Sequence, residues 1–128
     1  MSKGNILIIE DNRDILNAVR LMLESEGFTV IAKEDCTTAI NYLMENKPDV
    51  IVTDLMIPEM TGLEFIHQVR RITNYDRIPI IAMSAYDRTY LAAAVAAGAI
   101  KALHKPEDMD ILVDTVKEAL PLIKKEQN

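Results

Sequence analysis

The stretch from Val50 to Asp54 constrains the fold of this chain more than any other. Its first three residues are β-branched and apolar, and the run ends on a carboxylate. Such a run predicts a short strand that is buried on both faces, and Pro58 shortly afterwards excludes a continuing helix or central strand. Ligands of open parallel sheets bind at the carboxyl ends of the strands, so Asp54 is a candidate functional residue. Taken alone, an Asp at this position more often serves only to cap the strand or the next turn.

Apolar runs alternate with amphipathic segments along the whole chain. The predicted strands are Ile6–Ile9, Phe28–Lys33, Val50–Asp54, Pro79–Ser84 and Ile100–His104, and residues 74–77 are expected to form a loop. The first predicted helix has Ile15, Val19, Met22 and Leu23 on one face, and the second has Ile40, Leu43 and Met44, with Asp35 or Thr37 as its cap. The third has Leu63, Ile66, Val69 and Ile72 on one face, and the fourth is the alanine-rich segment Arg88–Ala97. The fifth, within Met109–Lys125, has Leu112, Val113, Val116 and Leu120 on one face. Pro121 is expected to kink or shorten the last helix. This alternation predicts an α/β fold, a doubly wound parallel sheet with right-handed crossovers.

Length and composition fit one globular domain. The 128 residues are 49% hydrophobic and 27% charged, with a net charge of −6 and no acidic tail, so we expect no direct contact with nucleic acid. Cys36 is the only cysteine, which excludes an internal disulfide, and it is expected to be a buried apolar residue. No segment resembles a signal peptide or a membrane span. We therefore expect residues 1–128 to form a single cytoplasmic domain without membrane insertion, frayed at 124–128.

Side chains that can take part in catalysis or metal binding follow four of the predicted strands. They are Glu10, Asp11, Asp54, Ser84 and Lys105. Since the carboxyl ends of parallel strands share one edge, we expect these side chains to meet there. Neighbouring carboxylates repel unless a proton or cation compensates their charge, and Mg²⁺ with oxygen ligands suits such a set. His67 and His104 are far apart, lack the spacing of metal ligands and are expected to be surface or packing residues.

A carboxylate beside a metal ion, a hydroxyl and an ammonium group can carry out phosphoryl transfer. Asp54 would be the nucleophile. The metal ion and Lys105 would neutralise charge on the phosphoryl oxygens, and Ser84 would hydrogen-bond one of them. Individually, Ser84 could be a turn hydroxyl and Lys105 a solvated strand end. Their expected convergence on one edge favours the chemical interpretation.

In this order and at these spacings, the motifs resemble the receiver domain of bacterial two-component response regulators, of the single-domain chemotaxis type. The motifs are the pair Glu10-Asp11; Asp54 followed by Met56, Pro58 and Gly62; the pair Ser84-Ala85; and Lys105-Pro106. The resemblance implies a flavodoxin-like fold with strand order 2-1-3-4-5 and helices on both faces. It also implies a signalling switch that catalyses only its own phosphorylation and dephosphorylation, rather than a metabolic enzyme.

The resemblance further implies a metal site. Asp11 and Asp54 resemble direct ligands of Mg²⁺, with Glu10 acting largely through bound water. Met56 would offer its backbone carbonyl.

It implies a phosphoryl site as well. Asp54 resembles the residue that takes a phosphoryl group from a phosphohistidine of a sensor histidine kinase or histidine phosphotransfer protein. Ser84 and Lys105 resemble the pair that holds the aspartyl phosphate, and Ala85 the small residue that keeps the pocket open. The Lys105–Pro106 bond resembles a cis peptide usual in the family. The downstream partner is unknown, and the expected assembly is a monomer or a weak, phosphorylation-dependent dimer.

Three features depart from the family pattern. Ala102 stands where a switching Tyr or Phe is usual, and Glu107 where a Phe commonly follows the Pro. Met56 and Tyr86 are bulky where fast-hydrolysing relatives have polar groups. We therefore expect a long-lived aspartyl phosphate. The signal is expected to stay in the loop and helix after the fourth strand, with Tyr86 or Tyr90 as the moving aromatic.

Three other functions compete with this interpretation. A pseudo-receiver would bind a partner without phosphate, but Asp54, Ser84 and Lys105 are all in place. A phosphatase of the haloacid-dehalogenase type would need a second acid two residues after the nucleophile, where this chain has Met56. A flavodoxin-like mononucleotide binder would want Ser, Thr or Gly after the first strand, whereas the acidic pair there would repel a phosphate that lacks a metal.

Overall fold

Five parallel strands form one sheet in the order β2-β1-β3-β4-β5. The computed structural model describes residues 2–57, 60–72, 78–85 and 88–127. The strands are β1 (Asn5–Ile9), β2 (Thr29–Lys33), β3 (Val50–Asp54), β4 (Ile80–Ser84) and β5 (Lys101–His104). This sheet confirms the predicted fold class and strand order. The loop expected at 74–77 lies outside the described residues.

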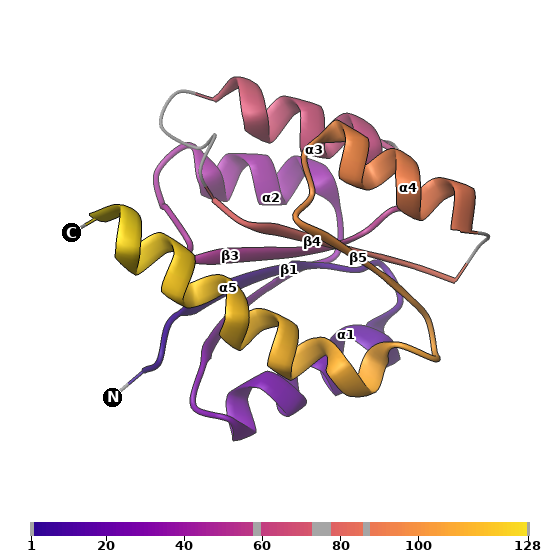
Figure 1. Cartoon of the computed structure of the whole chain (residues 1–128). Coiled ribbons are helices and arrows are strands. Elements are labelled where there is room, and N and C mark those ends of the chain that lie inside the picture. The colour runs from indigo at the N-terminus through magenta and orange to yellow at the C-terminus, as the bar shows by residue number, and fades with distance from the viewer. Residues whose placement is uncertain (1, 58–59, 73–77, 86–87, 128) are drawn as a thin grey trace.

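Helices cover both faces of the sheet, as predicted. They are α1 (Arg13–Ser25), α2 (Cys36–Leu43), α3 (Gly62–Arg71), α4 (Arg88–Ala97), the short 3₁₀ helix η1 (Met109–Ile111) and α5 (Leu112–Gln127). Figure 1 shows α2, α3 and α4 on one face and α1 and α5 on the other. Within the described residues, no helix is long and apolar enough to cross a membrane.

Side-chain caps explain where three of the helices begin. The Asn12 side chain accepts hydrogen bonds from two backbone N–H groups in the first turn of α1. Asp35, one of the two predicted candidates, caps α2 by accepting from the N–H of Thr38 at 2.7 Å, and Thr61 caps α3. Each cap satisfies backbone donors that the helix itself cannot pair.

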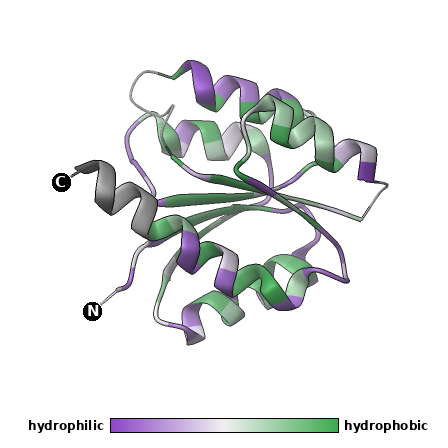
Figure 2. Cartoon of the chain, viewed as in Figure 1, coloured by the Kyte–Doolittle hydropathy of each residue, from purple (hydrophilic) through white to green (hydrophobic). Residues whose placement is uncertain are grey.

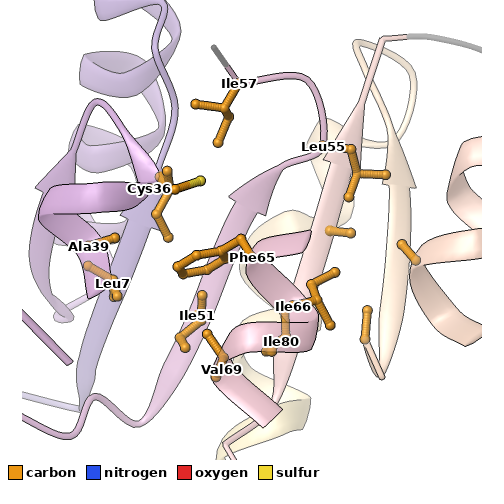
Figure 3. Packing of buried hydrophobic residues seen from close by; sticks show 14 of the residues in the cluster. Leu7, Cys36, Ala39, Ile51, Leu55, Ile57, Phe65, Ile66, Val69 and Ile80 are labelled. Carbon is orange, nitrogen blue, oxygen red and sulfur yellow. The ribbon is translucent and has the colours of Figure 1, made fainter. Parts of the chain in front are cut away.

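The core on the α2–α3–α4 face centres on Phe65 of α3. Its side chain is fully buried, and Figure 3 shows the ring pointing towards α2, with Cys36, Ala39 and Leu7 on that side. The predicted stripe of this helix omitted Phe65 and included Ile72, which lies just beyond the helix end. The burial expected for Cys36 is confirmed.

The core on the other face is formed by α1 and α5 against the sheet. In α1 the buried stripe includes Leu16, which the prediction lacked, while Met22 is only half-buried. The first turn of the last helix is 3₁₀, and α5 then continues past Pro121 to Gln127. The proline therefore does not shorten the helix, and of the two expected effects only the kink stays a prediction. On the opposite face, Met44 lies beyond the end of α2 and is 68% exposed, which also contradicts the prediction. Figure 2 shows the strands between the two layers as strongly hydrophobic.

Candidate functional site

The predicted site residues lie at the carboxyl ends of β1, β3, β4 and β5, on the right-hand side of Figure 1. The register pairs Asp54 of β3 with Met83 of β4, and Ser84 with His104 of β5, so these strands end at nearly the same level. Glu10, directly after β1, is 1% exposed, Asp54 is 5% exposed and Ser84 is fully buried. Two carboxyl groups are thus buried at one edge, a costly arrangement unless a cation compensates it.

Lys105 supplies that compensation within the protein. Its Nζ donates to Oε1 of Glu10 at 2.7 Å and also to Oδ2 of Asp54. The Lys105 side chain is 10% exposed, so both ion pairs lie in surroundings where charges interact more strongly than in water. These contacts bring three of the predicted site residues together.

The other oxygen of each carboxylate is held by backbone. Oε2 of Glu10 accepts from the N–H of Asn12 at 3.3 Å, and Oδ1 of Asp54 accepts from the N–H of Met56 at 2.7 Å. Each carboxylate therefore has a donor on both of its oxygens. This fixes the orientation of Asp54 before any partner arrives.

Burial and the neighbouring charges shift two pKa values at the site. Burial is the largest cause of the rise in the pKa of the Glu10 carboxyl to about 7; the hydrogen bond from Lys105 opposes this rise, and the charge of Asp54 adds to it. For Lys105, burial alone would lower the pKa, but the hydrogen bonds to Asp54 and Glu10 raise it above its ordinary value. The lysine is therefore charged at neutral pH.

The backbone around the site is closely packed. Gly62 begins α3 directly against the end of β3: a Cβ there would lie 2.5 Å from the Cα of Leu55 and 2.6 Å from the carbonyl oxygen of Asp54. On the other side, the N–H of Lys105 donates to the carbonyl oxygen of Ser84 at 2.8 Å. The Lys105–Pro106 peptide bond is cis, as the resemblance implied.

Two residues predicted to supply metal ligands are more exposed than Glu10 and Asp54. Asp11 is exposed, and Met56 is 39% exposed with its backbone N–H bonded to Asp54. Within the described ranges, no three side chains of Asp, Glu, His or Cys form a group that could hold a metal ion by themselves. A complete protein cage is not what Mg²⁺ requires, because it commonly binds through one or two carboxylates, waters and a phosphate. The buried, oxygen-rich pair Glu10 and Asp54 fits that mode.

Sequence reasoning missed one cluster beside the site. Nδ1 of His104 lies 2.8 Å from Oε2 of Glu107, and Nη2 of Arg88 lies 3.9 Å from the same oxygen. The only sequence signal was a His and a Glu three positions apart on either side of Lys105-Pro106. His104 is half-buried and His67 is exposed, both within the expected surface or packing roles, but the contact of His104 with Glu107 was not predicted.

This geometry coincides with a family match that covers most of the chain. Residues 6–117 match the response regulator receiver domain. The chain belongs to this family. Receiver domains of two-component systems are signalling modules that work with a histidine kinase and a downstream effector, and they generally bind Mg²⁺ in an acidic pocket. The predicted resemblance is confirmed.

Similar proteins include both short and longer chains. An uncharacterized 14.6 kDa protein encoded in the sodA1 3′ region of Leptolyngbya boryana is 33% identical over 119 residues, covering 92% of this chain and 91% of that protein. The response regulator MprA of Mycobacterium sp. (strain KMS) is 31% identical over 116 residues, covering 90% of this chain. The match covers 50% of MprA, so this receiver spans about half the length of that relative.

Solved structures agree with the fold. The chemotaxis response regulator CheY4 of Vibrio cholerae superimposes with a TM-score of 0.84 at 28% identity, covering 91% of this chain and 98% of CheY4. A putative response regulator from Chloroflexus aurantiacus J-10-fl gives a TM-score of 0.87 at 26% identity, covering 92% of this chain and 98% of that one. Both are similar along almost their entire length.

Proposed function

We propose that this receiver is a phosphorylation-dependent switch in which Asp54 accepts a phosphoryl group from a phosphohistidine. The observation that carries the proposal is the placement of Asp54, which lies buried at the end of β3 with Lys105 bonded to one carboxylate oxygen. The second carboxylate, Glu10, is held by the same ammonium group. A buried carboxylate that is paired with an ammonium group and oriented in this way is suited to act as a nucleophile.

The transfer is a displacement at phosphorus. An oxygen of Asp54 would attack the phosphorus atom, forming an O–P bond while the P–N bond to the donor histidine breaks. The electron pair of the broken bond would stay on the histidine nitrogen. Exchange of protons with solvent would then leave the donor side chain as neutral imidazole. Positioning and charge neutralisation, rather than covalent assistance, are what the protein supplies in such reactions.

The neighbouring residues have distinct roles in this proposal. Lys105 would exchange part of its contact with Asp54 for a phosphoryl oxygen, and the Ser84 hydroxyl would donate to another. Asp11, Glu10 and Asp54, with the backbone carbonyl of Met56, would hold Mg²⁺. When bound, the ion would neutralise charge on the phosphoryl group.

The partners follow from the donor chemistry. The phosphoryl donor would be a sensor histidine kinase or a histidine phosphotransfer protein, acting on this receiver in the cytoplasm. The output would be a protein contact through the loop and helix of residues 84–97. The receiver would work as a monomer or a weak, phosphorylation-dependent dimer. It would catalyse its own phosphorylation and dephosphorylation only.

Labelling with a small acyl-phosphate donor tests this function. The parent protein is expected to take up one phosphoryl group in the presence of Mg²⁺ and to lose that uptake in Asp54→Asn or on chelation of the metal. Asp110→Asn, an exposed acid in η1, is the matched control and should label like the parent. An unlabelled parent would instead favour the phosphate-independent pseudo-receiver.

A further inference from the structure

The connection between β5 and α5 is a closed unit around Lys105. The N–H of His104 donates to Oδ2 of Asp108 at 2.8 Å, and the N–H of Asp108 donates to the carbonyl oxygen of His104 at 2.8 Å. The imidazole of His104 is in turn bonded to Glu107 at 2.8 Å. Three short contacts therefore close the segment 104–108 on itself. The backbone of Lys105 cannot shift far without the rest of this segment following.

This unit touches both the phosphoryl site and α4. At one end, Lys105 bonds the buried carboxylates of Glu10 and Asp54. At the other end, Glu107 faces Arg88, the first residue of α4, across 3.9 Å between Oε2 and Nη2. Arg88 and Glu107 are both mostly exposed, and an exposed ion pair contributes little to stability. The link can therefore break and form again without unfolding anything.

His104 lies on the same face of β5 as Ala102, the residue that stands where the family usually has a Tyr or Phe. Side chains alternate along a strand, so His104 and Ala102 point to the same face, and Leu103 to the other. Ala102 packs against the core on the α2–α3–α4 face, whereas Leu103 belongs to the opposite core. The imidazole is thus the aromatic ring of β5 on the α4 side, at the strand position that pairs with Ser84.

We propose that the segment 104–108 transmits the state of Asp54 to the start of α4 through the His104–Glu107–Arg88 contacts. The inference rests on the proposed function, since it needs a phosphoryl group to draw Lys105 away from Asp54. As Lys105 moves, the closed segment carries Glu107 with it and changes its distance to Arg88. This linkage takes over the coupling that Ala102 is too small to provide.

Chemical-shift mapping with beryllofluoride, a phosphoryl mimic, tests the linkage. In the parent protein with Mg²⁺, we expect the His104 ring resonances to shift with the same midpoint as the amides of Asp54 and Ser84. In Glu107→Gln, the shifts in the first turn of α4 should fall at least twofold, while those at Asp54 persist. Arg88→Gln should produce the same loss from the other end of the link.

The matched control is Glu34→Gln, which removes an exposed acid paired with Arg13 at 2.6 Å, away from this segment. It should leave the α4 shifts at parental size. Unmoved His104 ring resonances in a parent that binds the mimic, or undiminished α4 shifts in Glu107→Gln, would overturn the linkage alone. No shift at Asp54 or Ser84 in the parent would overturn the proposed function, and the linkage with it.

Discussion

Burial makes the charge of Glu10 sensitive to pH near neutrality. Its pKa is raised to about 7, chiefly by burial, whereas in the unfolded chain the carboxyl returns to its ordinary value of 4.5. Between these two values the folded protein holds a proton that the unfolded chain has lost, so stability falls as pH rises through this window. The effect is on the order of 3 kcal/mol at most.

Urea unfolding of the metal-free protein at several pH values checks this. We expect the free energy of unfolding to decline between about pH 4.5 and 7 in the parent, and Glu10→Gln to flatten most of that decline. The control is Glu34→Gln, an exposed acid that should keep the parental slope. A parental slope in Glu10→Gln would mean that another group titrates in this range.

Asp11 contrasts with Glu10 because it is exposed and, among the described contacts, engages neither Lys105 nor Asp54. Its replacement by Asn should therefore change the metal-free stability little. It should lower the affinity for Mg²⁺ by at least about tenfold, as loss of groups at metal sites commonly does. Denaturation midpoints with and without Mg²⁺ measure the metal-free stability and the affinity for the ion. A midpoint of the parent protein that is unchanged by Mg²⁺ would contradict the metal site.

At the scale of elements, the connection from β3 to α3 sets the environment of Asp54. Gly62→Ala would place a methyl group against backbone atoms of Leu55 and Asp54, 2.5 and 2.6 Å away. We expect a net loss of about 2 kcal/mol, because overpacking against backbone outweighs the better helix propensity of alanine. Phosphoryl uptake at Asp54 should slow as well.

Thr61→Ala is the neighbouring control for this substitution. It removes only the α3 cap bond to the N–H of Glu64 and should cost about 1 kcal/mol without slowing uptake. Equal stability of Gly62→Ala and the parent in urea would show that α3 does not need this close approach.

The same connection carries Met56, whose side chain is partly exposed beside Asp54. Hydrolysis of the aspartyl phosphate needs a water molecule in line with phosphorus, and the thioether of methionine orients water poorly. Met56→Asn is therefore expected to shorten the phosphate lifetime by about tenfold, part of what full orientation of a reactant can achieve. Loss of label over time measures the lifetime of the aspartyl phosphate, and Met56→Leu is the control. A half-life of seconds in the parent protein would contradict the expected long-lived phosphate. Tyr86, the other bulky residue, lies outside the described residues.

At the scale of the whole molecule, the strand–helix alternation was enough to predict a parallel sheet, because buried parallel strands appear as continuous apolar runs. The strand order came from the resemblance to receiver domains. Helix stripes were less predictable. Phe65 and Leu16 were missed because several apolar spacings fit each helix, and only packing against the sheet selects one. Pro121 did not end α5, although proline in a helix interior is usually unfavourable.

The placement of the candidate residues at one edge was predictable, but their contacts were not. Sequence order places Asp54, Ser84 and Lys105 at one edge, since parallel strands share their carboxyl ends. It does not show that Lys105 bonds both Glu10 and Asp54, nor that Glu107 meets Arg88, because these contacts depend on how distant segments pack. Whether Tyr90, 43% exposed on α4, moves on phosphorylation remains a prediction.

The central claim is that Asp54 alone receives the phosphoryl group, and borohydride trapping followed by mass spectrometry tests it most directly. After labelling with the acyl-phosphate donor and Mg²⁺, reduction converts a phosphorylated aspartate to homoserine, which peptide sequencing locates. We expect homoserine at position 54 in the parent and at no acid in Asp54→Asn. Homoserine at position 11, or label retained at the parental level in Asp54→Asn, would contradict the claim.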